Sequence, residues 1–106
     1  MLDRFESKHF DDENGNPAGG HSKGIGMSID WQNGPLGRGK TRLSPNGAFV
    51  ETVIAVVIDR LEYYQASRFK CRENALAITK LQEANHWLNH RTQDREKREV
   101  EGTHTE

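Results

Sequence analysis

Two pairs of side chains in the C-terminal half of the chain could together recognise a nucleotide. Arg91 and Arg95 stand one helical turn apart, a spacing that suits a pyrophosphate because planar guanidinium groups bond phosphate oxygens in pairs. Tyr64 and Asn74 flank a short connecting segment, where an aromatic ring could stack on a purine and an amide could bond its edge. The alternative interpretation of the two arginines is a solvated helix end, because arginine is mostly exposed in proteins.

The spacing of these pairs imposes a geometric constraint. Asn74 and Arg91 are 17 residues apart on one expected helix, which is about 25 Å at the α-helical rise. The two pairs therefore cannot hold one small ligand within a single chain. If they form one pocket, the arginines come from a neighbouring subunit, and an antiparallel dimer of helix hairpins would contain two such pockets.

A third group of candidate residues, three cations, lies within a motif that matches a nucleotide-binding loop. Residues 34–41 read GPLGRGKT, the P-loop pattern. A P-loop needs a helix that begins at its lysine, here Lys40, but a proline and a glycine follow within seven residues. We therefore reject the P-loop and expect a basic strand whose face carries Arg38, Lys40 and Arg42, an edge that attracts anions.

Other groups with potential chemistry have simpler interpretations. Glu83 and His86 have the spacing of di-iron bundles, and His90 follows one turn later, but the chain has no second Glu-x-x-His segment. A symmetric dimer could supply one, yet a solvated helix face without metal is the preferred interpretation. Cys71 lies between two cations that could activate a thiol, but no base is placed beside it and we expect a small apolar filler.

Hydropathy patterns predict the elements that position these residues. Residues 1–24 have no apolar pattern and many helix and strand breakers, which predicts a disordered or flexible tail. Residues 25–32 alternate apolar and polar side chains, as in a half-buried strand. Asn33 and Gly34 form a hairpin-turn signal, and a weaker strand over 36–43 would extend the strands to about 25–43.

Two helices should follow. Residues 48–66 carry apolar side chains at spacings of four and three, although the β-branched run 53–58 leaves a buried strand as an alternative. A second stripe predicts a helix over about 72–98, and the short connection makes the pair an antiparallel hairpin. The expected fold class is α+β, a small antiparallel sheet and then a two-helix hairpin, in a single domain over 25–106.

Composition limits the function classes. The chain has 106 residues, of which 33% are apolar and 29% charged, and a formal net charge of −1. A monomer this small and polar would have a marginal core, so we expect an oligomer. Near-zero net charge argues against binding of DNA or of a membrane surface. No secretory signal or membrane span is evident, and the cytoplasm is the expected location.

The sequence resembles the phage-encoded Thoeris anti-defence sponge family, the founding type that sequesters cyclic ADP-ribose signals. The resemblance covers about residues 25–105 and is most specific in two C-terminal segments, RTQDR at 91–95 and VEGTH at 100–104. It is also carried by WQNGP at 31–35, PNG at 45–47, RL and YQ within 60–65, RENALA at 72–77, LQEA at 81–84 and WL at 87–88.

The resemblance implies a small β part followed by a helical hairpin, similar to the hairpin of the phage sponge that counters CBASS defence. Members form dimers, and some assemble as trimers of dimers. They bind glycocyclic ADP-ribose without cleaving it, in pockets shared between subunits, and some hold cyclic di- or trinucleotides at separate sites.

The resemblance also assigns roles to residues of this chain. The family's stacking aromatic falls on Tyr64, its amide on Asn74, and its two phosphate-binding arginines on Arg91 and Arg95. A further family arginine precedes the first helix, and the three cations of the segment 36–44 are equal candidates for it.

The resulting hypothesis is a phage- or prophage-encoded sponge that acts in the host cytoplasm, with neither a cofactor nor an enzymatic activity. Two alternatives stay open. A hydrolase or lyase acting on the same cyclic nucleotides would have to use Glu83, His86 or His90, which form no evident catalytic arrangement. A small adaptor would bind a protein partner through its helices and no nucleotide.

Overall fold

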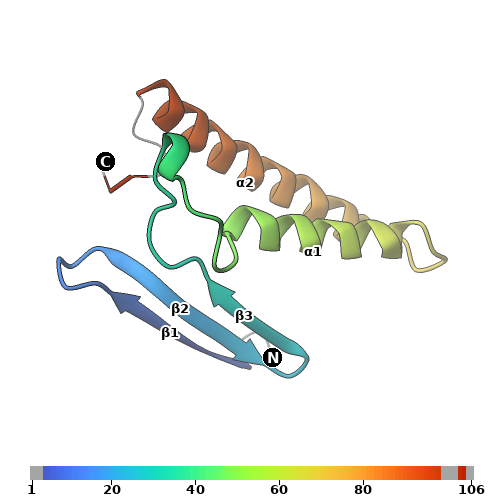
Figure 1. The fold of residues 1–106 in the computed structure, drawn as a ribbon. Coiled ribbons are helices and arrows are strands. Elements are labelled where there is room, and N and C mark those ends of the chain that lie inside the picture. The colour runs from blue at the N-terminus through green and yellow to red at the C-terminus, as the bar shows by residue number, and fades with distance from the viewer. Residues whose placement is uncertain (1–3, 99–102, 105–106) are drawn as a thin grey trace. The chain divides into compact units, whose positions relative to one another are not determined.

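The computed structural model describes residues 4–98 and 103–104, which form two compact units (Figure 1). A sheet unit extends to Phe49 and includes Thr103 and His104, and a helical unit begins at Val50. The elements are, in order, β1 (Phe5–Asp11), β2 (Pro17–Gly24), β3 (Met27–Trp31), a short 3-10 helix η1 (Gly39–Thr41), α1 (Val50–Gln65) and α2 (Arg72–Lys97). The predicted α+β class is confirmed, whereas the single domain predicted over 25–106 is divided at residue 50.

The sheet has the order β1-β2-β3, and both pairs of neighbours are antiparallel. A two-residue turn, Ile25 and Gly26, joins β2 to β3, because Gly24 pairs with Met27. Gly26 has a φ of 74°, a left-handed conformation that glycine adopts at little cost. The hairpin turn is therefore at this position, and the turn that the sequence predicted at Asn33-Gly34 does not join two strands.

The prediction of a flexible tail over residues 1–24 was wrong for the part that the structure describes, since β1 and β2 occupy most of it. Glycine in this segment allows the strands to lie close together. A Cβ at Gly20 would collide with the backbone oxygen of Lys8 on β1. Polar side chains also link the strands, because Trp31 Nε1 donates to Ser22 Oγ at 3.0 Å and the hydroxyls of Ser7 and Ser22 lie 2.7 Å apart. Residues 1–3 lie outside the described residues.

The helical unit is the predicted antiparallel hairpin, in which α1 and α2 lie side by side (Figure 1). The helix bounds agree with the predicted ranges 48–66 and 72–98 to within two residues, and the alternative of a buried strand over 53–58 was wrong. Ile54 and Leu61 on α1 are half-buried, as are Leu81 and Leu88 on α2. Asn85 adds a polar link, with its Nδ2 donating to the backbone oxygen of Glu51 at 3.2 Å.

The apolar surface of the hairpin is largely uncovered in the single chain. No residue of α1 or α2 is fully buried, and Val56 and Trp87 are 64% and 62% exposed. Among the described residues, Leu36 of the sheet unit is the one buried apolar side chain. Neither described helix combines the length and apolarity of a membrane span.

Candidate functional site

The loop end of the helical hairpin fixes the positions of Tyr64 and Asn74. Gln65, the last residue of α1, clamps the backbone of Cys71 at the start of α2: its Oε1 accepts from Cys71 N at 2.9 Å, and its Nε2 donates to Cys71 O at 3.0 Å. Ser67 Oγ donates to the backbone oxygen of Tyr64 at 2.6 Å, and the backbone N–H of Ser67 donates to the same oxygen at 3.0 Å. Tyr64 and Asn74 therefore project from a junction held by hydrogen bonds on both sides.

Cys71 is the N-cap of α2. Its Sγ accepts a hydrogen bond from the backbone N–H of Asn74 at 3.4 Å, and its side chain is exposed. The prediction of a small apolar filler was therefore wrong. The cap sets the first turn of α2, on which Asn74 occupies the third helical position and is half-buried.

Tyr64 lies within a cluster that also contains Arg60 and Tyr63. The Arg60 guanidinium carbon is 4.9 Å from the centroid of each ring, and Arg60 Nε donates to the Tyr64 hydroxyl at 3.2 Å. The two rings are 5.8 Å apart and tilted by 59°. Arg60 was not among the predicted site residues, although an arginine four residues before a tyrosine on a helix is a readable signal.

Arg91 and Arg95 lie near the other end of α2. Arg91 is exposed and Arg95 is half-buried, on a helix that is continuous from Arg72 to Lys97. At the α-helical rise the 17 residues from Asn74 to Arg91 span about 25 Å. Tyr64 and Asn74 thus flank the loop between α1 and α2, Arg91 and Arg95 lie about one turn apart on α2, and the length of α2 separates the two pairs within one chain.

The three loop cations belong to the sheet unit, and their predicted strand does not form. Arg38 precedes the 3-10 helix η1, Lys40 lies within it and Arg42 follows it, with the N–H of Arg42 donating to Gly39 O. The prediction that these side chains share one strand face was wrong. Only the three-residue 3-10 helix η1 includes Lys40, α1 begins ten residues later at Val50, and both described strand pairs are antiparallel, which confirms that the motif is not a P-loop.

A side-chain clamp closes the loop that carries these cations. Asn46 Oδ1 accepts from Asn33 N at 2.8 Å, Asn46 Nδ2 donates to Asn33 O at 3.1 Å, and Asn46 N donates to Gln32 Oε1 at 2.9 Å. Gly47 then passes against the end of β3 so closely that a Cβ would lie 2.6 Å from the carbonyl carbon of Trp31. The clamp therefore holds both ends of the cationic loop together.

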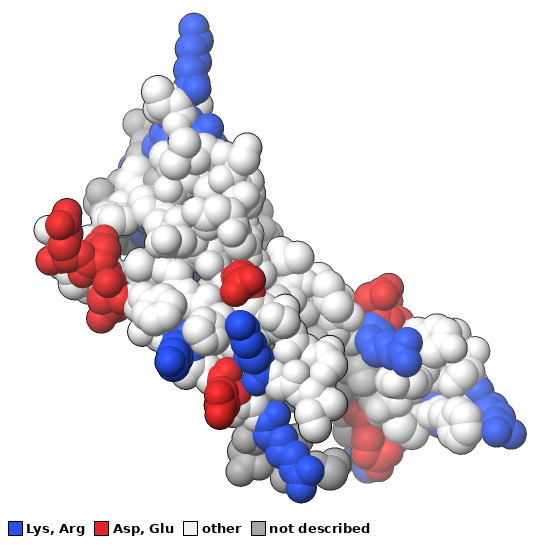
Figure 2. Space-filling view, turned by 60° about the horizontal axis from the view of Figure 1, so that its bottom comes forward, with Lys and Arg blue, Asp and Glu red and all other residues white. Residues whose placement is uncertain are grey.

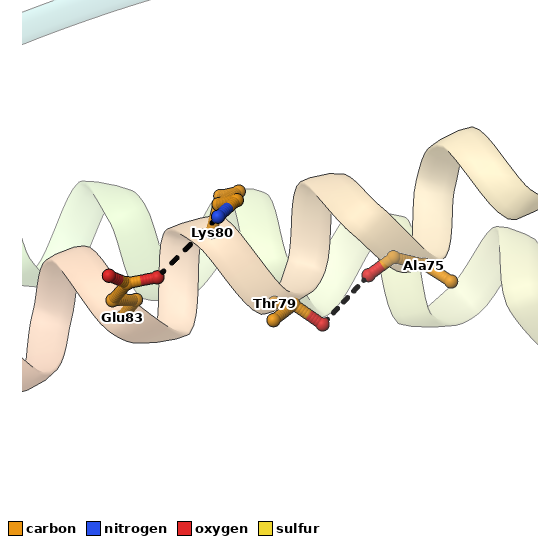
Figure 3. A network of polar contacts seen from close by, with 4 residues as sticks. All are labelled: Ala75, Thr79, Lys80 and Glu83. Carbon is orange, nitrogen blue, oxygen red and sulfur yellow. Dashed lines mark hydrogen bonds and ion pairs between the residues drawn. The ribbon is translucent and has the colours of Figure 1, made fainter.

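The outer face of α2 carries solvated and aromatic groups. Glu83 pairs with Lys80 at 3.8 Å, and Thr79 Oγ1 donates to the backbone oxygen of Ala75 (Figure 3). Both imidazoles of the proposed di-iron pattern, His86 and His90, contact the ring of Trp87 edge-on. Within residues 4–98 and 103–104, no three His, Cys, Asp or Glu side chains are arranged to hold a metal ion.

Within the described part of the chain, the surface carries mixed charge and a hollow in the sheet unit. Acidic and basic side chains are interspersed on the face that Figure 2 shows, in keeping with the net charge of −1. A hollow of about 520 Å³ in the sheet unit involves none of the sequence-predicted site residues. It is lined by Arg4, Phe5, Glu6, Lys23, Gly24 and Ile25.

Residues 24–93, which run from the end of β2 through most of α2, match the model of the family described as "Acb2/Tad1, hairpin domain". The chain belongs to this family. The match confirms the resemblance found in the sequence. It includes Tyr64, Asn74 and Arg91, and it ends two residues before Arg95.

A related protein is "Thoeris anti-defense 1" of Bacillus phage SBSphiJ7, which is 49% identical over 94 residues. The alignment covers 81% of this chain and 63% of the relative. The chain therefore spans less than two thirds of the relative's length. Similarity at this level extends over most of the hairpin domain that the Acb2/Tad1 family shares.

Proposed function

We propose that this protein is a phage anti-defence sponge, which binds a cyclic nucleotide immune signal of the glycocyclic ADP-ribose class and lowers its free concentration without cleaving it. The observation that carries the proposal is the division of ligand-suited side chains between the two ends of the helical hairpin, with Tyr64 and Asn74 at the loop end and Arg91 and Arg95 at the other. Membership of the Acb2/Tad1 family and the name of the phage relative support it.

The proposed pocket is composite. In an antiparallel dimer of hairpins, the loop end of one chain meets the far end of α2 of a second chain, and symmetry makes two equal pockets. Tyr64 stacks on the adenine, and Asn74 bonds its edge. Arg91 and Arg95 of the second chain hold the pyrophosphate. One of the loop cations, Arg38, Lys40 or Arg42, closes over the ligand.

Burial of the exposed apolar residues of the hairpin would favour dimerisation. Val56, Val57 and Tyr63 are all exposed on α1, and burying such side chains against a second copy contributes about 25 cal/mol per Å² of apolar surface. Dimers of this kind can assemble further into trimers of dimers. Cyclic di- or trinucleotides would then occupy sites separate from the composite pockets.

Sequestration needs affinity and copy number but no catalytic group. The side chains proposed to contact the ligand stack, bond and neutralise charge, and none is placed as a general base beside a nucleophile. Glu83, one of the three residues that a hydrolase would have to use, pairs with Lys80 on an exposed helix face. The protein would act in the cytoplasm of the infected bacterium, where such signals are made.

A thermal-shift panel with cyclic ADP-ribose isomers and cyclic oligonucleotides tests the proposal. A bound ligand raises the melting temperature by mass action, and heat denaturation then releases it for chromatography. A shift with intact ligand released supports a sponge. A shift with altered ligand would identify an enzyme, and no shift with any member of the panel would favour an adaptor of protein partners.

Substitution of Arg95 tests the placement of the phosphate groups. Arg95→Ala removes charge-assisted hydrogen bonds and should weaken binding by about 1.5 to 3 kcal/mol, or roughly ten- to a hundredfold. Lys80→Ala is the matched control, since it removes a cation from the exposed outer face of the same helix. Unchanged binding by Arg95→Ala would refute this placement.

A further inference from the structure

Arg60 is a charged residue without a role in the proposed pocket, yet it contacts the ring on which that pocket depends. Its guanidinium lies 4.9 Å from the Tyr64 centroid, and its Nε donates to the Tyr64 hydroxyl at 3.2 Å. The contacts are therefore of two kinds, a cation over the π-system and a hydrogen bond to the ring's polar end.

Tyr63 holds the same guanidinium from a second side. Arg60 is 4.9 Å from the Tyr63 centroid as well, and the two rings stand 5.8 Å apart. Tyr63 is 62% exposed and Tyr64 is 37% exposed. The three side chains thus brace one another on one face of the last turns of α1, and Tyr64 keeps part of its surface accessible.

We infer that Arg60 is a positioning residue for purine binding: it occupies one face of the Tyr64 ring, fixes the ring's orientation and leaves the opposite face for the adenine. The inference rests on the proposed function, because it assigns Tyr64 the stacking role. The ligand class that this arrangement takes is an anionic nucleotide with an accessible purine face.

Two physical effects make the arrangement favourable. A ring already held in one rotamer loses less conformational freedom when it stacks, so part of the entropic cost of binding is removed in advance. A cation behind the ring draws π-electron density away from the face that meets the purine, and it also attracts the ligand's negative charge. Lysine would supply the charge but not the planar fork that contacts two rings and a hydroxyl together.

The hydroxyl of Tyr64 accepts the hydrogen bond from Arg60 Nε and so helps to fix the ring. Phenylalanine would keep the stacking surface and the cation contact, but it would lose the acceptor for Arg60 Nε. Tyr64→Phe therefore separates the hydrogen bond from the stacking, whereas Arg60→Met removes both Arg60 contacts and retains an aliphatic stem of similar length.

The test compares Arg60→Met, Arg60→Lys, Tyr64→Phe and Tyr64→Ala with the unaltered protein. The probe is the glycocyclic ADP-ribose isomer that gives the largest thermal shift, and the readouts are its dissociation constant and the hypochromism of its adenine band at saturation. Melting temperatures without ligand check that each variant is folded. We expect Arg60→Met to bind about three- to tenfold more weakly, with reduced hypochromism, and Arg60→Lys to recover part of both. Tyr64→Phe should fall between the unaltered protein and Arg60→Met.

The outcomes separate this inference from the proposed function. If Arg60→Met binds as the unaltered protein does while Tyr64→Ala abolishes binding, the role of Arg60 is refuted and the sponge stands. If Arg60→Met weakens binding with full hypochromism, Arg60 does not act through stacking and the inference also fails. If Tyr64→Ala binds normally, or the unaltered protein binds no isomer, the proposed pocket itself fails.

Discussion

The proposed composite pocket can be tested by mixing two variants that each bind the ligand weakly. In the proposed dimer, Tyr64→Ala would remove the stacking ring and Arg95→Ala would remove a phosphate contact, and each variant alone would damage both pockets of its own dimer. In a mixed dimer the damage is distributed unequally. One pocket carries both substitutions, and the other combines Tyr64 of the Arg95→Ala chain with Arg95 of the Tyr64→Ala chain and is intact.

The expected recovery follows from counting. If equal amounts exchange freely, about half of the dimers contain one chain of each variant, and one of the two pockets in each is intact, so about a quarter of the sites of the unaltered protein should return. Each variant alone should bind roughly ten- to a hundredfold more weakly. Titration calorimetry of the refolded mixture, at ligand concentrations below the dissociation constant of either variant, measures this fraction.

The matched control mixes Tyr64→Ala with Asn74→Ala. Both residues lie at the loop end of the hairpin, so every pocket of that mixed dimer has a defective purine side and none should return. Recovery in this control would place the tyrosine and the amide in different pockets. Absence of recovery in the Tyr64→Ala and Arg95→Ala mixture, once native mass spectrometry has shown that chains exchange, would refute the shared pocket.

Three further predictions concern local structure. Cys71→Ser should raise the free energy of unfolding by a few tenths to about 1 kcal/mol, because serine is a stronger N-cap, and a lower urea midpoint would contradict this. Gly26→Ala should cost about 1 to 2 kcal/mol through backbone strain alone, since a Cβ there meets nothing within 4 Å; faster hydrogen exchange of the β2–β3 amides would report it, and unchanged exchange would refute it. Backbone N–H groups of Asn16 and Asn14 hold the pKa of Asp12 below its ordinary value. The turn should therefore be fully stabilised above about pH 4 and lose that stabilisation as pH falls through the lowered pKa; amide shifts of Asn16 should follow this titration and stay flat in Asp12→Asn.

Hydropathy predicted the helices because each keeps a regular apolar stripe on the side that faces the other. Hydropathy did not predict β1. All seven residues of β1 are exposed, so the strand has no buried face that an alternating apolar pattern would reveal. The strand exists through its ladder of backbone hydrogen bonds with β2, which no local pattern of side chains records. Gly20 favours a flexible tail when it is judged from the sequence alone. In the structure a glycine is needed at this position because β1 and β2 lie too close together for a Cβ.

The candidate site was predictable to the extent that it depends on distances along a helix. The separation of Asn74 from Arg91 follows from sequence spacing once the helix is recognised. The clamp of Asn46 on Asn33 was not predictable, because it joins side chain to backbone across 13 residues without a periodic pattern. The same holds for the Arg60 contacts, which depend on rotamers as well as on spacing.

The shortage of core and the division of the site have a common geometric origin. A hairpin of two helices has one inner face, and here the inner face leaves Val56 and Trp87 exposed in the single chain. A second copy that covers α1 in antiparallel orientation would bury apolar surface and bring the loop end of one chain beside the arginine end of the other. Ligand bound across that interface would contact both chains, so its binding free energy would add to that of assembly. On this reasoning a chain too small to build a core or a pocket alone would obtain both from the same contact.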